Sequence, residues 1–303
     1  MNHTERYTSF IIEKSHITSV EIAHSARGYT LTAAGSFDSE IDFDDPVIFE
    51  ESGMDKRIKI FSGEIQNFMK RTGAGSKYFS FGLNSRMAML QRIPIEMSLT
   101  DEEFNVHLEW ELKNYYPDAV MENYILLPFA LVDSSGNPGT KAMIIGVRKS
   151  LSNFLRSVSK KCFATDHVVD IDHFCAETAI MHNFPQATKE RTAVIGIDEE
   201  SIDCSLLVNG KNSDITIERW SGTSEIKKIA EYAFEHNAEQ IFLHGRIVDE
   251  LTAEQLKQFT PLPVSISDPF KKISLPPTIK NVDAIKAHRQ EYTAAVGLAL
   301  RKD

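Results

Sequence analysis

A capped amphipathic helix between two strands, within residues 91–128, constrains the fold of this chain more than any other segment. Thr100 and Glu103 have the spacing of a capping box, in which each side chain accepts a hydrogen bond from the other residue's backbone N–H. Pro117 ends the helix, because proline has no N–H to donate and disfavours a helical residue before it. The apolar residues between these signals recur at near-helical spacing, which predicts one buried stripe consisting of Phe104, Leu108, Leu112 and Tyr115.

The length and the charge of the chain limit the classes of function. Its 303 residues are enough for two medium domains, and 42% hydrophobic with 25% charged residues is typical of a globular protein in water. The formal net charge of -10 argues against nonspecific binding to nucleic acid and against attraction to anionic lipid, because both favour basic surfaces. An acidic protein can still dock onto a basic segment of another protein.

The cysteines and the hydrophobic pattern indicate where such a chain works. No CxxC spacing occurs among the cysteines, which favours a reducing cytosol over a disulfide framework; they are Cys162, Cys175 and Cys204. The N-terminus lacks the apolar core of a secretory signal peptide, and no apolar run approaches the length of a transmembrane helix. We therefore expect a cytoplasmic protein that does not insert into the membrane and is held at its inner face through a partner.

The order of strands and helices predicts an α/β protein. A strand pair is expected over Tyr7–Ala23 and a third strand over Gly28–Phe37, ahead of the strongly periodic helix Ser150–Phe163. The strand Val168–Ile171 then leads into a helix that Asp172 is expected to cap. This alternation of strand and helix favours partly parallel strands.

The second half of the chain repeats this order. The Asn209-Gly210 pair predicts a hairpin, because both residues tolerate positive φ. A helix is expected over Thr223–His236 with Phe234 on its core face, and the closing helix Tyr292–Arg301 is rich in small residues that permit close backbone packing. Each half therefore starts with a strand meander and continues with helices, which suggests a duplicated α/β lobe.

Four segments carry a resemblance to a known family. They are IPIEMSLTDEEFNVHLEWELKNYYP, MIIGVRKSLSNFLRSVSKKC, HVVDIDHFCAETA and the closing YTAAVGLALR, in this order along the chain. In these segments the chain resembles the PilM family of type IV pilus assembly proteins. That family belongs to the superfamily of actin, the Hsp70 chaperones and the sugar kinases, together with the cytoplasmic domain of GspL and the division protein FtsA.

The resemblance implies an α/β fold of the actin-like (ribonuclease H-like) kind, with two lobes around a nucleotide cleft. It also implies an inserted α+β subdomain in the first lobe. The expected domains are residues 1–85 and 141–186 for the first lobe, 86–140 for the inserted subdomain and 187–303 for the second lobe.

The nucleotide site is where this chain departs from the family. Members that bind ATP use a glycine-rich turn in each lobe, where backbone N–H groups approach the phosphates, and an aspartate at each turn that helps to hold hydrated magnesium. In the first turn of this chain, Ile11 stands at the aspartate position and Glu13 at the first glycine position, close to Ser15. Both requirements are therefore lost in this turn.

The second turn departs in the same way, with Gly196 at the aspartate position and Asp198 at the glycine position. A carboxylate at such a glycine repels a phosphate by about 4 kcal/mol per charge pair at roughly 4 Å and an effective dielectric near 20. In the adenosine loop, Gly245 alone is kept. We therefore expect a degenerate nucleotide site, with no cofactor, near these glycines and carboxylates; the alternative is an ATP-binding switch of the same fold that uses magnesium.

Other kinds of catalytic or metal site find little support. His173 and His182 lie on one predicted helix without the spacing of metal ligands, so structural roles are favoured over zinc. Asp170 and Asp172 form a carboxylate pair at a strand end, where capping is favoured over acid–base catalysis. No pattern of a serine or cysteine nucleophile is present. A small-molecule kinase would need an intact phosphate turn, so we expect neither a metal site nor an enzyme.

By resemblance, the chain is expected to be an adaptor in the inner-membrane platform of a type IV pilus or a type II secretion-like system. Its partner would be a PilN-like protein with a single membrane span, whose cytoplasmic N-terminal segment lies in a groove between the first lobe and the inserted subdomain. The aromatic residues Trp110, Tyr115 and Tyr116 are candidates for this contact. For Trp110 the alternative is a second buried face of the helix.

Overall fold

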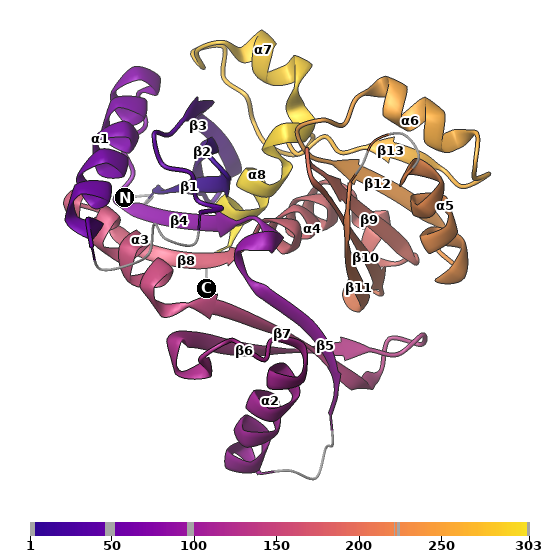
Figure 1. Cartoon of the computed structure of the whole chain (residues 1–303). Coiled ribbons are helices and arrows are strands. Elements are labelled where there is room, and N and C mark those ends of the chain that lie inside the picture. Colours follow the sequence, from indigo (N-terminus) through magenta and orange to yellow (C-terminus); the bar gives the residue numbers. More distant parts are fainter. Residues whose placement is uncertain (1–3, 46–51, 96–99, 221, 223–224, 302–303) are drawn as a thin grey trace.

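Two five-stranded sheets and one three-stranded sheet form the framework of the protein, as the computed structural model shows (Figure 1). The structure describes residues 4–45, 52–95, 100–220, 222 and 225–301. The first sheet has the strand order β3-β2-β1-β4-β8, in which β1, β2 and β3 are antiparallel and β4 and β8 join β1 in parallel. Its strands are β1 (Glu5–Glu13), β2 (His16–Ser25), β3 (Gly28–Asp38), β4 (Tyr78–Leu83) and β8 (Thr165–Ile171).

The second sheet repeats the topology of the first. Its order is β11-β10-β9-β12-β13, again with an antiparallel meander of three strands followed by two parallel strands. The strands are β9 (Thr192–Ile197), β10 (Ser201–Val208), β11 (Lys211–Arg219), β12 (Gln240–His244) and β13 (Val264–Ile266). Asn209 and Gly210 both have positive φ in the turn between β10 and β11, which confirms the predicted hairpin.

Two helices cover the outer face of the first sheet, and two others lie between the sheets. Helices α1 (Met54–Thr72) and α3 (Lys149–Lys161) share a core with the phenylalanines of β1 and β4. Helices α4 (Asp172–Asn183) and α8 (Thr293–Leu300) pack on the opposite face. The second sheet is covered by α5 (Ile226–Glu235) and α6 (Glu250–Lys257), while α7 (Val282–Ala287) precedes α8.

Small residues bring α4 and α8 into close contact, as predicted from the closing helix. Each residue of α8 is buried. A Cβ atom at Gly297 would lie 1.7 Å from the carbonyl oxygen of Cys175 in α4, so only glycine permits this approach of two backbones. The contact joins the strand-to-helix unit of the first half to the last helix of the chain.

The three-stranded sheet and α2 (Asp101–Tyr115) lie beside the first lobe. The strand order of this sheet is β5-β7-β6. Its central strand β7 (Pro138–Arg148) pairs antiparallel with β5 (Met89–Pro94) and with β6 (Tyr124–Val132). The capping box of Thr100 and Glu103 is present at the start of α2, and Leu108 and Leu112 are buried under the helix. The predicted domain boundary after residue 140 falls inside β7, and the boundaries as a whole stay a prediction.

Three local predictions are wrong. Tyr115 is 52% exposed, because the buried stripe of α2 ends one turn earlier, at Leu112. Phe234 is 83% exposed, since α5 turns Ile226, Ile229, Ala230 and Ala233 inward instead. Asp172 is the first residue of α4 rather than its cap; Ile171 holds the cap position, and the Asp172 carboxylate accepts a hydrogen bond from the N–H of His173.

Residues 223 and 224, where α5 was expected to begin, lie outside the described residues. None of the helices in the described part of the chain is long and apolar enough to cross a membrane.

Candidate functional site

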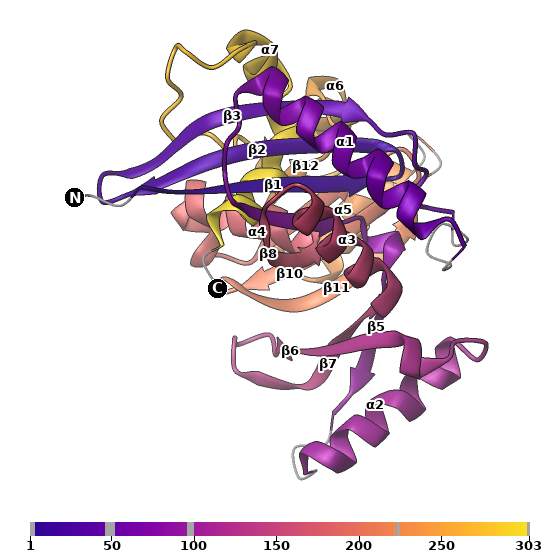
Figure 2. The same ribbon diagram turned by 90° about the vertical axis from the view of Figure 1, so that its left-hand side faces the viewer.

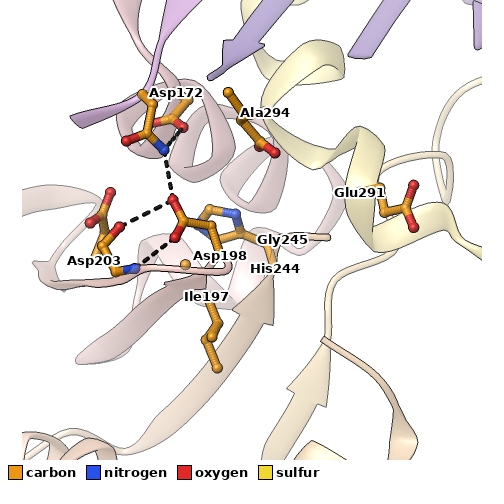
Figure 3. Close-up of a pocket in the computed structure, with 12 residues that line it drawn as sticks. Asp172, Ile197, Asp198, Asp203, His244, Gly245, Glu291 and Ala294 are labelled. Atoms are coloured by element: carbon orange, nitrogen blue, oxygen red, sulfur yellow. Dashed lines mark hydrogen bonds between the residues drawn. The ribbon is translucent and has the colours of Figure 1, made fainter. Parts of the chain in front are cut away.

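The turns of the two lobes meet at an inter-lobe cleft that is nearly filled by its own side chains (Figure 3). Between the two turns, the space for the centres of water molecules is about 20 Å³, which is room for one or two waters and not for the phosphate groups of a nucleotide. A separate hollow of about 360 Å³ lies beside it, along residues 246–250. The lining of the cleft combines carboxylates from both lobes with one amide and one imidazole; it consists of Glu13, Asn84, Asp172, Gly196, Ile197, Asp198, Ser201, Asp203, His244, Gly245, Glu291 and Ala294.

Asp198 occupies the backbone donors of the second turn. Its Oδ1 atom accepts hydrogen bonds from the N–H groups of Glu200 and Ser201, at 2.7 and 2.6 Å, and its Oδ2 atom accepts one from the Ser201 hydroxyl. In ATP-binding relatives the N–H groups of this turn are the expected phosphate ligands. A side-chain carboxylate of the chain itself therefore stands where the resemblance places a phosphate.

The aspartate position of the second turn has no room for a side chain. A Cβ atom at Gly196 would lie 2.8 Å from Cε1 of His244 and 3.2 Å from Nδ1 of His173. The two imidazoles are themselves joined, with His244 Nε2 and His173 Nδ1 3.2 Å apart. Burial lowers the pKa of His244 to about 4 and the pKa of His173 well below its usual value, so both rings are neutral at pH 7. A neutral histidine pair therefore fills the space beside Gly196.

The first turn is a tight hairpin between β1 and β2. Glu13 pairs with His16, and Lys14 takes a left-handed conformation with φ of 58°. Burial, together with the neighbouring Asp198 carboxylate, raises the pKa of Glu13 to about 7, although the guanidinium of Arg246 opposes the shift. Arg246 lies 3.8 Å from Glu13 and 3.0 Å from Glu199, so a cation of the second lobe is already paired at this point.

Polar side chains at the end of β4 tie the lobes together. Asn84 Nδ2 donates to Asp198 Oδ2 at 2.8 Å, and the Ser85 hydroxyl donates to Asp203 Oδ1 at 3.0 Å. Arg86 follows and contacts Glu200 at 2.5 Å. Because these bonds cross from the first lobe to the second, opening the cleft for a ligand would break all of them.

Burial shifts two further carboxyl groups of the cleft toward their neutral form. Burial raises the pKa of Asp203 to about 7, and burial together with the charges of Asp203 and Glu13 raises the pKa of Asp172 well above its usual value. Among the residues that the structure describes, no group of three or more histidines, cysteines, aspartates or glutamates is placed to hold a metal ion. The cleft resembles an acidic contact between lobes more than a ligand site.

A larger hollow, called here the tyrosine groove, lies where the inserted subdomain joins the first lobe. It has a volume of about 500 Å³ and is open to solvent. Aromatic and apolar side chains dominate its walls, with an arginine from each side; the lining consists of Arg86, Met87, Ala88, Met89, Tyr115, Tyr116, Pro117, Asp118, Ala119, Tyr124 and Arg148. They come from residues 86–89 at the start of β5, from residues 115–119 at and after the end of α2, from the first residue of β6 and from the last residue of β7.

The structure brings most of the predicted residues into these two places. Glu13, Gly196, Asp198 and Gly245 line the cleft, and Ser15 lies in the β1–β2 turn beside Glu13. Tyr115 and Tyr116 line the tyrosine groove, where half-buried Tyr116 donates a hydrogen bond to the Leu90 carbonyl at 3.4 Å. Trp110 is 60% exposed and is not among the groove residues, so the buried alternative is wrong and its place in a partner contact stays a prediction.

Sequence reasoning missed several residues of the cleft. Asn84 and Asp203 were not singled out, because each becomes significant only through a partner far away in the sequence. One signal was present: His244 directly precedes Gly245 in the adenosine loop, where small residues are expected. Asp170, paired with Asp172 in the sequence, instead forms an ion pair with Arg301 near the C-terminal end of the described chain.

Comparisons with solved structures identify the fold. The PilM–PilN type IV pilus biogenesis complex matches with a TM-score of 0.70 and 17% identity, over 97% of this chain and 98% of that one. A Bacteroides thetaiotaomicron protein with an actin-like ATPase fold matches with a TM-score of 0.52 and 14% identity, over 88% and 91% of the two chains. The predicted actin-like fold is thereby confirmed.

The sequence comparisons identify the family. A search of characterised proteins gives no significant match. The profile of the family described as type IV pilus assembly protein PilM matches residues 12–232, well over half of the chain. This confirms the resemblance stated from the sequence, and the chain belongs to the PilM family of type IV pilus assembly proteins.

Proposed function

We propose that this protein is a non-enzymatic adaptor of an inner-membrane assembly platform. In this proposal the tyrosine groove holds the cytoplasmic N-terminal segment of a PilN-like protein with one membrane span. The protein would then stay in the cytoplasm, at the inner face of the inner membrane, through that partner. The observation that carries the proposal is the contrast between a cleft with room for about 20 Å³ and a groove of about 500 Å³ beside Tyr115 and Tyr116.

The filled cleft supports the non-enzymatic part of the proposal. A working nucleotide site needs free backbone N–H groups and a carboxylate that can reach magnesium. Here Asp198 holds the N–H groups, and the histidine pair leaves no room for a side chain at Gly196. Binding ATP would require both the separation of the lobes and the displacement of Asp198.

The chemistry of the tyrosine groove supports a peptide as its occupant. Tyr115, Tyr116 and Tyr124 offer flat apolar surfaces, and Met87 and Met89 can adapt to the shape of a ligand. Such a groove takes an extended segment with apolar side chains, as in other sites that clamp short peptides. The solved complex of a PilM with a PilN, similar to this chain in fold, makes a PilN-like segment the first candidate.

Calorimetric titration with the cytoplasmic N-terminal peptide of the PilN-like protein from the same organism tests the proposal. Tyr115→Ala is the informative variant, because the side chain is 52% exposed and its loss costs little stability. We expect this change to weaken binding by about tenfold, the usual effect of removing a central aromatic contact. Phe234→Ala is the matched control, since it removes an exposed aromatic side chain from α5.

Two further measurements separate the alternatives. Trp110→Ala tests the remaining predicted contact, and we expect a smaller effect than for Tyr115→Ala because Trp110 lies outside the groove lining. Titration with Mg-ATP tests the switch hypothesis. No saturable heat is expected in the micromolar range, and a clear saturable signal there would contradict the degenerate site.

A further inference from the structure

The outer faces of α1 and α3 carry a concentration of lysines that the net charge of the chain conceals. The two helices lie side by side at the front of Figure 2. They are joined by a hydrogen bond from the Gln66 amide in α1 to the Lys161 carbonyl in α3, at 3.2 Å. Seven exposed basic residues of this layer form what we call the basic helical face; they are Lys56, Lys59, Lys70, Lys149, Arg156, Lys160 and Lys161. Arg71 is also exposed but is not counted, because it donates a hydrogen bond to the Ser36 carbonyl in β3.

Helix α3 contributes a continuous basic stripe. Lys149, Asn153, Arg156 and Lys160 follow one another at spacings of three and four residues, so they share one side of the helix. All four are exposed, while Leu151, Phe154, Leu155 and Val158 point into the core. The helix contains no acidic residue in its sequence KSLSNFLRSVSKK.

Helix α1 presents a similar stripe beside it. Lys59, Gln66 and Lys70 lie at helical spacing on its exposed side, and Lys56 stands one turn before them. Of the two acidic residues of α1, Asp55 lies in the first turn, four residues before Lys59, and the stripe beyond it contains no acidic residue. Glu64 is turned away, where its carboxylate accepts hydrogen bonds from the Ser39 hydroxyl and the Glu40 N–H.

Little counter-charge lies close to these lysines. Arg156 pairs with Asp166 at 3.3 Å. None of the six lysines has a carboxylate oxygen within 4.0 Å in the part of the chain that the structure describes. The basic helical face therefore carries positive charge, although the chain as a whole has a formal net charge of -10.

One large apolar side chain stands at the end of this face. Phe163 follows the C-cap residue Cys162, two positions after Lys161, and it is 91% exposed. Its φ of 59° is a left-handed conformation that bulky residues rarely adopt. Hydrogen bonds from the Phe163 N–H to the Lys160 carbonyl and from the Ala164 N–H to the Ser159 carbonyl close the turn around it. Both the exposure and the backbone conformation point to a functional role for this side chain.

We propose that the basic helical face docks this protein onto an anionic phospholipid surface, with Phe163 entering the headgroup region. The face is made of lysines far more than arginines, and lysine is a flexible point charge rather than a fork for specific phosphate geometry. It is a pair of packed helices with an apolar side chain at one end, and exposed lysines beside an apolar residue favour peripheral binding to anionic leaflets. Such docking needs no transmembrane helix.

The position of the face agrees with the proposed function but does not depend on it. Arg148 lines the tyrosine groove, and the next residue, Lys149, begins the basic stripe of α3. A segment that comes from the membrane into the groove would therefore pass beside a surface that itself contacts the membrane. The sequence-based expectation that a net negative charge excludes attraction to lipid treats the charge as evenly spread, which it is not.

Co-sedimentation with vesicles tests the proposal in the absence of any peptide. We expect binding to phosphatidylcholine vesicles with about 30% phosphatidylglycerol at physiological ionic strength, and none to pure phosphatidylcholine vesicles. Each lysine near an anionic leaflet contributes about fivefold in affinity, so Lys59→Gln with Lys160→Gln is expected to lower binding by about 25-fold. Lys227→Gln with Lys257→Gln, on α5 and α6, removes the same charge elsewhere and is expected to leave binding unchanged.

A second variant tests the apolar contact. Asparagine adopts left-handed conformations readily, so Phe163→Asn keeps the turn while removing the ring, and we expect a loss of about tenfold in vesicle affinity. Four results would overturn the proposal: no binding to anionic vesicles, equal binding to neutral ones, an equal loss in the α5 and α6 control, or binding to an RNA oligomer without binding to vesicles. Because peptide titration needs no vesicles, failure of either proposal leaves the other testable.

Discussion

The contact between α4 and α8 allows a stability change to be predicted from a single atom. Gly297→Ala places a Cβ atom 1.7 Å from the Cys175 carbonyl oxygen and 3.0 Å from the Ala179 nitrogen. Both neighbours are helix backbone, so the helices must separate by about 1 Å, and overpacking of this kind costs about 1–3 kcal/mol or more. Alanine is better than glycine inside a helix by at most about 1 kcal/mol, which offsets only part of that loss. We expect a net loss of about 2 kcal/mol.

The same substitution in another helix supplies the control. Gly63 lies inside α1, and a Cβ atom there has no heavy atom within 4 Å, so Gly63→Ala is expected to stabilise the protein by up to about 1 kcal/mol. Urea unfolding of both variants measures the two free energies, and a thermal scan should show a melting temperature lower by about 4 °C or more for Gly297→Ala. If Gly297→Ala matched or exceeded the stability of the wild type, α4 and α8 would not be packed as described.

Three further predictions concern the polar interior. Burial raises the pKa of Glu177 to about 7, so the native protein keeps a proton that the unfolded chain releases above pH 4.5. Rising pH between these values therefore removes up to about 3 kcal/mol of unfolding free energy, and Glu177→Gln should flatten this part of the profile in urea titrations at different pH. Asn84→Ala should lower the free energy of unfolding in urea by about 1.5–3 kcal/mol, because Asp198 loses its donor from the other lobe. An unchanged midpoint would show that this hydrogen bond between the lobes does not stabilise the protein. Gly196→Asp, which restores the aspartate of ATP-binding relatives, should lower the melting temperature and create no magnesium-dependent shift, since His244 fills that space.

Local signals in the sequence predicted the elements well where neighbouring residues determine them. The capping box at Thr100 and the hairpin at Asn209-Gly210 depend on residues a few positions apart, and both are present. The order of strands was sufficient to suggest a duplicated lobe, which the two matching sheets bear out. The boundary of the α2 stripe was misjudged at Tyr115, because spacing alone does not show where the surface beneath a helix ends.

The candidate site could be predicted only in part, because sequence patterns do not show which distant residues come into contact. Loss of glycine and aspartate was visible in each turn, but the hydrogen bonds that the Glu200 and Ser201 N–H groups donate to Asp198 depend on the backbone geometry of the turn. The histidine pair at Gly196 joins residues 71 positions apart in the sequence. The total charge likewise predicted an acidic surface and gave no sign that α1 and α3 would gather lysines on one side.

The central claim is that this protein works through the tyrosine groove and not through the nucleotide cleft. Hydrogen exchange read by mass spectrometry, with and without a saturating amount of the PilN-like peptide, locates the working surface directly. We predict slower exchange over residues 86–89 and 115–119, which line the groove, and unchanged exchange in the cleft turns at residues 13–16 and 197–201. Protection confined to the cleft turns, by the peptide or by Mg-ATP, would contradict the account.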